Sequence, residues 1–440
     1  MKFFLRKFFS ADRRLNLSFL ELQKPFKCEK LIGLVTLTAV IFAVFFNTQT
    51  TEHVEFGQTL AGLLPININN EFYIFRQQDS SLQIVLPALL LKMGMASGLL
   101  GVIISVACQV TAFLAVTLVT YFLTQSSLAS FFSIFLYFKT LPNGSHLYPL
   151  YFPIAFSAFG ALGTWMAILC VGLWLNDFKK TAMFFLGLLL SVHLVWFLVA
   201  LTFLGFFIFK ERASKRQVIS FLVGIAISCS SFLTFRYFKT HYFEKSFYKT
   251  EYDTASIDQT QWTRPHVDGQ LRTTFQLHNP RIIQPTLSET LKQFWSLNQA
   301  SVYFFLLIGL LFLMRLISKG IFQSFAIPYA LIYVVTLLSL AFVEWNDVYS
   351  MADPVATLVL RAIPNRFLNV AFALTPALCV SSFFRLYIQG QDRWIKGLAV
   401  LVAILYLRDP NRTLPLFIAG LFLLQVVRTR YPNQIRLAHV

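Results

Sequence analysis

Two carboxylates near the start of the first long polar segment have the spacing of a catalytic pair. The segment begins TQTTEHVEFGQ, in which Glu52 and Glu55 are three residues apart and His53 lies between them. If the segment is helical, residues three apart share one face of the helix. A carboxylate shielded from bulk water can have a raised pKa and accept a proton from a sugar hydroxyl. The alternative is a solvated segment whose acidic residues only stabilise the start of a helix.

Later polar segments carry cationic residues of the kind that binds phosphate. The motifs WTRPH and HNPR each place an arginine near a histidine at a proline-containing turn: Arg264 with His266, and His278 with Arg281. A guanidinium group can bind phosphate through two hydrogen bonds. Arg361 and Arg366 flank a Pro-Asn turn just before an apolar run, where an unpaired charge is costly. A solvated loop for the first two motifs, and snorkelling for the last two arginines, are the alternatives.

Other polar residues at the ends of apolar runs are further candidates for substrate binding, together with His53, His278 and Arg281. Arg76 and Asp79 are three apart, so they pair with each other or Asp79 caps the following helix. His146 and Tyr148 belong to the turn LPNGSHLYP, whose aromatic residues are typical of a membrane interface. His193 interrupts an apolar stretch, where it is either a functional group or a packed, hydrogen-bonded side chain.

The composition excludes most classes of soluble protein. The chain has 440 residues, of which 56% are hydrophobic and 13% are charged, and its formal net charge is +17. Soluble globular proteins carry roughly 25% charged residues. A soluble enzyme, a disordered chain and a nucleic-acid-binding domain are therefore excluded. The 5 cysteines lie far apart without Cys/His ligand spacing, so we expect no metal centre, disulfide framework or cofactor.

The apolar runs predict an all-α integral membrane protein with about twelve transmembrane helices and both termini in the cytoplasm. The run 181–209 decides the topology. As one long helix it would place the basic segments 176–180 and 210–216 on opposite sides of the membrane. A break at Ser191-Val192-His193 places both segments in the cytoplasm, as the positive-inside tendency requires. With this topology, roughly +16 of the net charge lies in the cytoplasm.

Two large extracytoplasmic loops separate the membrane modules. The predicted organisation is a basic amphipathic segment 1–30, a membrane module 31–235 with outer loop 47–83, an outer loop 236–300, and a membrane module 301–440 with outer segment 344–366. The predicted spans of the first module are 31–47, 97–123, 126–138, 149–175, 181–192, 194–209 and 217–235. Between the first two spans, residues 82–93 are expected to form a helix lying along the membrane surface.

This layout is similar to that of the GT-C superfamily of polytopic membrane glycosyltransferases, which use polyprenyl-phosphate-linked sugars. The passages LYPLYFPIAFSAFGALGTWMAILCVGLWL and AMFFLGLLLSVHLVWFLVALTFL resemble the tandem hairpins of bacterial members. The resemblance implies that Glu52, or secondly Glu55, is the base toward the acceptor hydroxyl. It also implies that the donor phosphate is bound by Arg361, Arg366, Arg264 and His266. Protein mannosyltransferases have an Asp-Glu pair where this chain has Glu-His, so the acceptor class stays open.

The expected function is transfer of a sugar from a polyprenyl-phosphate donor to a glycan or protein acceptor, without a metal. The reaction would take place on the extracytoplasmic face of a bacterial cytoplasmic membrane. One alternative is an O-antigen polymerase or ligase-like enzyme, whose catalysis would depend on the arginines and histidines of loop 236–300. The other is a non-enzymatic transporter of lipid-linked glycans, in which interior polar residues would matter more. The bilayer is a partner in all three cases, and nucleic acid in none.

Overall fold

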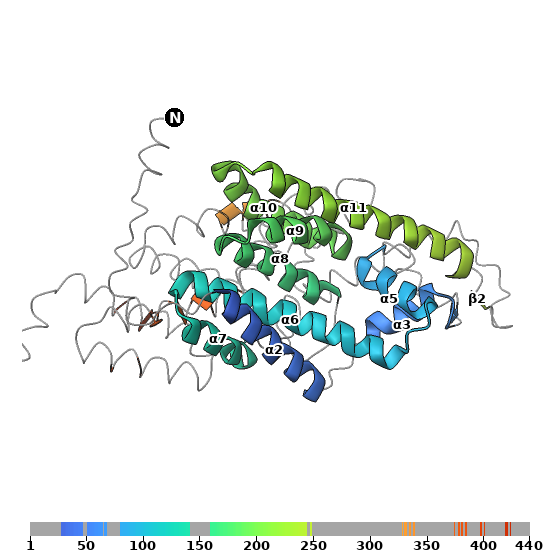
Figure 1. The fold of residues 1–440 in the computed structure, drawn as a ribbon, viewed down its shortest axis with the longest axis horizontal. Helices are drawn as coiled ribbons and strands as arrows, with labels where there is room; N and C mark the ends of the chain where they lie inside the picture. Colours follow the sequence, from blue (N-terminus) through green and yellow to red (C-terminus); the bar gives the residue numbers. More distant parts are fainter. Residues whose placement is uncertain are drawn as a thin grey trace, which may run out of the picture.

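Helices account for nearly all of the chain that the computed structural model describes. The described residues are 28–46, 51–64, 66–67, 80–140, 159–243, 247–248 and scattered positions between 328 and 423. The longer helices lie with their axes in roughly similar directions and form a bundle (Figure 1). The predicted all-helical class is confirmed for these residues, apart from a short parallel pairing of β1 (Ile66–Asn67) with β2 (Phe247–Tyr248).

Three of these helices are long and apolar enough to cross a membrane: α2 (Cys28–Phe46), α6 (Ser97–Thr124) and α11 (Lys215–Phe238). At 1.5 Å per residue, the 28 residues of α6 extend about 42 Å, more than the ~30 Å of a hydrocarbon core. The three helices coincide with the predicted spans 31–47, 97–123 and 217–235. This agreement supports the prediction that the chain is a membrane protein. The expected total of about twelve spans includes residues outside the described ranges and stays a prediction.

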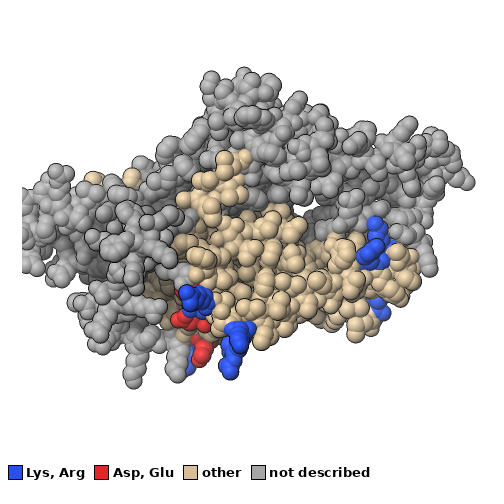
Figure 2. All heavy atoms as spheres, turned by 90° about the horizontal axis from the view of Figure 1, so that it is seen from above, with Lys and Arg blue, Asp and Glu red and all other residues tan. Residues whose placement is uncertain are grey.

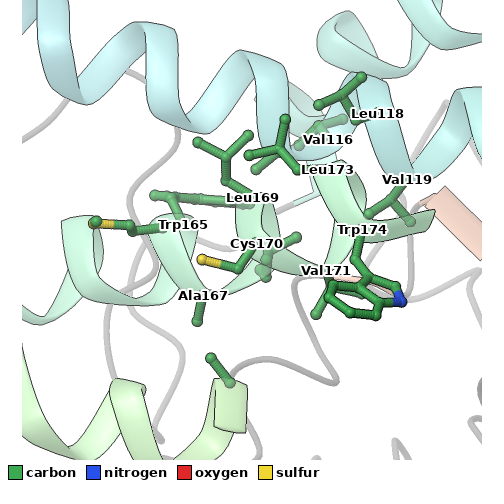
Figure 3. Close-up of a cluster of buried hydrophobic side chains, with 14 of the residues drawn as sticks. Val116, Leu118, Val119, Trp165, Ala167, Leu169, Cys170, Val171, Leu173 and Trp174 are labelled. Atoms are coloured by element: carbon green, nitrogen blue, oxygen red, sulfur yellow. The ribbon is translucent and has the colours of Figure 1, made fainter. Parts of the chain in front are cut away.

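The core of the bundle lies where α8 (Phe159–Leu175) packs against α6. Trp165, Cys170 and Trp174 of α8 are buried, as are Leu118 and Val119 of α6 (Figure 3). A helix that is apolar on all sides is suited to the centre of a bundle. α8 matches the described part of the predicted span 149–175, whose first residues lie outside the described ranges. α7 (Ser127–Thr140) follows α6 after a short turn and matches the predicted span 126–138.

The predicted break in the run 181–209 is confirmed. α9 (Lys179–Val192) and α10 (Leu194–Glu211) are separated by His193, whose φ of −166° and ψ of 106° are extended rather than helical. The Lys179 Nζ lies 2.7 Å from the Glu211 Oε2, which holds the start of α9 against the end of α10. The two helices therefore form a hairpin, and the segments 176–180 and 210–216 lie at the same end of the bundle.

α9 and α11 cross with their backbones in direct contact. A Cβ atom on Gly187 would collide with the Phe221 carbonyl oxygen of α11, and one on Gly224 would lie 2.8 Å from the Leu188 nitrogen of α9. The Ser228 hydroxyl of α11 donates a hydrogen bond to the Gly187 carbonyl at 2.9 Å. Small residues allow this approach, as they do at many helix crossings within membranes.

Two shorter helices, α3 (Thr51–Leu60) and α5 (Leu82–Lys92), pack together near the end of the bundle at which α9 and α11 end (Figure 1). The ion pair of Lys179 with Glu211 lies at the other end of α9. An apolar cluster joins α3 and α5 to the end of α11 and to the π-helical turn η1 (Lys239–Phe243). α5 confirms the helix expected at residues 82–93. Its N-cap is Ser81, whose hydroxyl accepts the hydrogen bond from the Gln83 backbone amide, so the capping alternative for Asp79 does not apply to α5.

Candidate functional site

The described part of the predicted site is centred on α3. This ten-residue helix fulfils the condition on which the carboxylate pair depended, because helical spacing places residues 52 and 55 on one face. Glu55 is exposed, whereas Val54 and Phe56 on either side of it are buried. α3 is therefore held on most sides by protein and presents one carboxylate outward.

His53 points into the protein and begins a chain of hydrogen bonds between distant segments. The ring is 1% exposed, and its Nε2 lies 2.7 Å from the Gln83 Oε1 of α5. The Gln83 Nε2 donates to the Val192 carbonyl at 2.9 Å. Because the amide nitrogen of Gln83 donates there, its oxygen is the acceptor for His53. His53 therefore carries a hydrogen on Nε2.

The Val192 carbonyl explains why this chain of hydrogen bonds is needed. Val192 is the last residue of α9, so its carbonyl lacks the partner that the next helical turn would supply. The 14 residues of α9 extend about 21 Å, which is less than the ~30 Å of a hydrocarbon core. A buried carbonyl without a helical partner has to be satisfied by other protein groups or by enclosed water. The Ser81 Oγ donates to the same carbonyl at 2.9 Å, so two buried side chains satisfy it.

His193 lies directly after this carbonyl. The ring is half-buried, and its centroid is 6.1 Å from that of the Trp196 indole. A Cβ atom on Gly163 of α8 would lie 2.8 Å from the His193 Cβ, so the break packs closely on α8. The structure thus links two of the predicted residues, because Gln83 and Val192 connect His53 to His193.

Ser81 and Gln83 were not among the predicted site residues. They are polar residues at the start of an apolar helix, and only the capping role of such residues is visible in a sequence. Their partner, Val192, is more than a hundred residues away. The signal that could have found them is the predicted break itself, since a buried helix end needs hydrogen-bond donors nearby.

A cationic and aromatic cluster lies where α5 meets the end of α11. The Lys92 Nζ is 3.9 Å from the centre of the Tyr242 ring, and Tyr237 stacks on His241 at 4.3 Å. Within the described ranges, no carboxylate pairs with Lys92, whereas Lys179 at the opposite end contacts both Asp177 and Glu211. The sequence signal for the cluster is the stretch RYFKTHYF, which was not singled out as a site.

Ten of the predicted site residues lie outside the described ranges. They are Arg76, Asp79, His146, Tyr148, Arg264, His266, His278, Arg281, Arg361 and Arg366. For Glu52 the structure describes the helical backbone. The convergence of these side chains on one site stays a prediction.

No group of three or more His, Cys, Asp or Glu side chains that could hold a metal ion occurs in the described part of the chain. Comparison of the chain with protein-family models, with curated proteins and with solved structures finds no match.

Proposed function

We propose that the protein is a GT-C-like membrane glycosyltransferase that moves a sugar from a polyprenyl-phosphate donor to an acceptor on the extracytoplasmic face of a bacterial cytoplasmic membrane. The observation that carries the proposal is the placement of α3. A short helix with two carboxylates three residues apart is fixed near one end of an apolar bundle, and Glu55 on it is exposed. That is a position from which a carboxylate can reach a substrate at a membrane surface.

The chemistry requires a base and a stabilised leaving group. In the transfer, the acceptor oxygen forms a bond to the anomeric carbon, and the bond from that carbon to the phosphate oxygen breaks. We assign Glu52 as the base that takes the proton of the acceptor hydroxyl, with Glu55 as the second choice. The bonding electrons leave with the phosphate, so the product is the polyprenyl phosphate and its developing negative charge has to be stabilised.

Positive charge near α3 supports this assignment. We propose Arg361, Arg366, Arg264 and His266 as the groups that bind the donor phosphate, because they belong to segments expected on the same side as α3. Lys92 lies on α5, which packs directly on α3, and Arg236 lies in the last turn of α11. These described cations would add to the positive potential around a departing phosphate.

The charge at the opposite end of the bundle supports the orientation. Lys179, Lys180, Lys215 and Arg216 lie at the starts of α9 and α11, around the hairpin closed by Lys179 and Glu211. Basic residues that flank membrane spans favour the cytoplasmic side. We therefore assign this end to the cytoplasm, which places α3 and α5 toward the extracytoplasmic face.

The proposal is tested by measuring sugar transfer in lipid nanodiscs from a radiolabelled polyprenyl-phosphate sugar. We expect Glu52→Gln to lower transfer by about 10²-fold or more, because the amide cannot accept the hydroxyl proton. Glu29→Gln is the matched control, since it removes an exposed carboxylate from the first turn of α2 near the Lys179 end. Full transfer by both Glu52→Gln and Glu55→Gln would contradict the assignment. Loss of a polymerised product only in His278→Ala or Arg281→Ala would favour the polymerase or ligase alternative.

A further inference from the structure

We infer that His53, Gln83 and Ser81 are positioning residues, which set the orientation of α3 against the break between α9 and α10 through their buried hydrogen bonds. The catalytic consequence rests on the proposed function, because it concerns the carboxylates that α3 carries. The structural part of the inference does not depend on that function.

The hydrogen bonds join three elements that are far apart in the sequence. His53 belongs to α3, Gln83 to α5, and Val192 ends α9. His53, Gln83 and Ser81 are 1%, 6% and 7% exposed, so water cannot readily replace a lost partner. A shift of α3 would therefore break a hydrogen bond in a place where it cannot be compensated.

α3 also packs directly on α5. Phe56 and Leu60 lie in the apolar cluster that the two helices share, and a Cβ atom on Gly57 would lie 2.6 Å from the Pro87 Cβ. The apolar contacts themselves are not directional, although this close approach limits how far α3 can move. A hydrogen bond weakens steeply when its angle changes, so the bond from His53 to Gln83 selects one orientation of α3.

The selected orientation matters because His53 is next to Glu52 and two residues before Glu55. A rotation of α3 that releases His53 moves both carboxylates relative to the rest of the site. A misplacement of about 1 Å can lower the rate of a reaction by about 10²-fold. We therefore expect loss of this hydrogen bond to lower kcat more than it raises the KM for the donor.

The test compares His53→Leu with His53→Gln in the full chain in nanodiscs. Leucine removes the donor, whereas the glutamine amide can donate to the Gln83 oxygen from a similar position. Hydrogen–deuterium exchange of the backbone amides of residues 51–60 and the steady-state kinetics of transfer are measured for each variant. Ser228→Ala is the matched control, because it removes buried hydrogen bonds to the Gly187 carbonyl and the Ser191 hydroxyl without contacting α3.

We expect His53→Leu to speed amide exchange in residues 51–60 by about tenfold or more and to lower kcat, because opening of a segment becomes easier when its contacts are lost. His53→Gln should restore both quantities, and Ser228→Ala should change neither. Unchanged exchange in His53→Leu would overturn the inference, as would equal effects of His53→Leu and Ser228→Ala.

If His53→Leu does not fold, Gln83→Met and Ser81→Ala provide the same comparison by removing the donors to Val192 one at a time. In that case unchanged exchange in residues 51–60 for both variants would overturn the inference. If the wild-type protein transfers no sugar while the exchange results are as expected, the positioning of α3 holds and the proposed function fails.

Discussion

Single side chains decide how the two ends of the α9–α10 hairpin are held. At one end, the Lys179 ammonium is 2.7 Å from the Glu211 carboxylate and 3.3 Å from that of Asp177. The hydrogen bond to Glu211 raises the pKa of Lys179 above its ordinary value of 10.5. At the other end, the Val192 carbonyl accepts hydrogen bonds from Ser81 and Gln83. One end thus depends on charge, and the other on neutral, buried hydrogen bonds.

Because the Lys179–Glu211 contact depends on charge, its contribution to the free energy of unfolding should depend on pH. A group whose pKa is raised by folding stabilises the fold below its unfolded pKa and ceases to do so as the pH passes its folded pKa. We expect Glu211→Gln to cost about 0.5–1 kcal/mol near pH 8, because the ion pair is partly exposed. The measurement is the thermal unfolding midpoint in detergent, with Arg212→Gln as the control.

The difference in midpoint between the wild type and Glu211→Gln should shrink only in alkali above the ordinary Lys179 pKa of 10.5. An equal midpoint at pH 8 would contradict a role for the pair in closing the hairpin. A difference that persists in strong alkali would show that the effect does not come from the charge on Lys179.

At the scale of elements, the close crossing of α9 and α11 determines where the hairpin sits. Gly187 and Gly224 meet backbone to backbone, and Ser228 bonds to the Gly187 carbonyl. This contact brings α9 against a helix long enough to cross a membrane, although α9 itself has only 14 residues. The α9–α10 break is covered by the start of α5, where Ser81 and Gln83 donate hydrogen bonds to the Val192 carbonyl.

We expect Gly187→Leu to destabilise the protein, because its side chain would collide with the Phe221 carbonyl region of α11. Overpacking of this kind costs about 1–3 kcal/mol. Gly205→Leu is the matched control, since nothing lies within 4 Å of a Cβ atom at that position in α10. The yield and thermal midpoint of detergent-solubilised protein measure both variants. Equal stability of the two variants would contradict the close crossing.

Elements were predictable from the sequence where a local pattern or a charge balance constrained them. The break at Ser191-Val192-His193 follows from the basic segments on either side of the run, and α5 follows from its apolar run. The sequence left the cap of α5 open because aspartate and serine both cap helices, and only the backbone geometry selects Ser81. The hydrogen bonds to Val192 depend on a contact between distant segments, for which no local pattern exists.

At the scale of the whole molecule, the described charged side chains lie toward the two ends of the helix bundle. Figure 2 shows lysine, arginine and acidic side chains gathered where α9, α10 and α11 meet, and further basic side chains toward the opposite end. No Lys, Arg, Asp or Glu occurs within the described segments 31–46, 97–124, 159–175 and 217–235, which lie between those ends. Such a band of uncharged side chains is typical of a protein that lies in a bilayer.

The proposed site also requires that α3 and the segment that carries Arg366, which are far apart in the sequence, lie close together in the folded protein. In a cysteine-free background, we expect Glu52→Cys and Arg366→Cys to be joined by a bifunctional thiol reagent that is long enough to span a sugar phosphate. The pair Glu29→Cys and Arg366→Cys is the control, because Glu29 lies in the first turn of α2, near the Lys179 end. Cross-linking of the control pair only would show that the base and the phosphate-binding residue do not share a site.

The most direct test of the central claim is a single-turnover measurement of sugar transfer with excess enzyme over a labelled polyprenyl-phosphate sugar. It isolates the chemical step from product release. The wild type and Glu29→Gln should convert the donor to glycosylated product and polyprenyl phosphate at the same rate. Glu52→Gln should be slower by about 10²-fold or more, as expected for loss of a general base. Equal rates for Glu52→Gln and the wild type would contradict the assignment of Glu52 as the base.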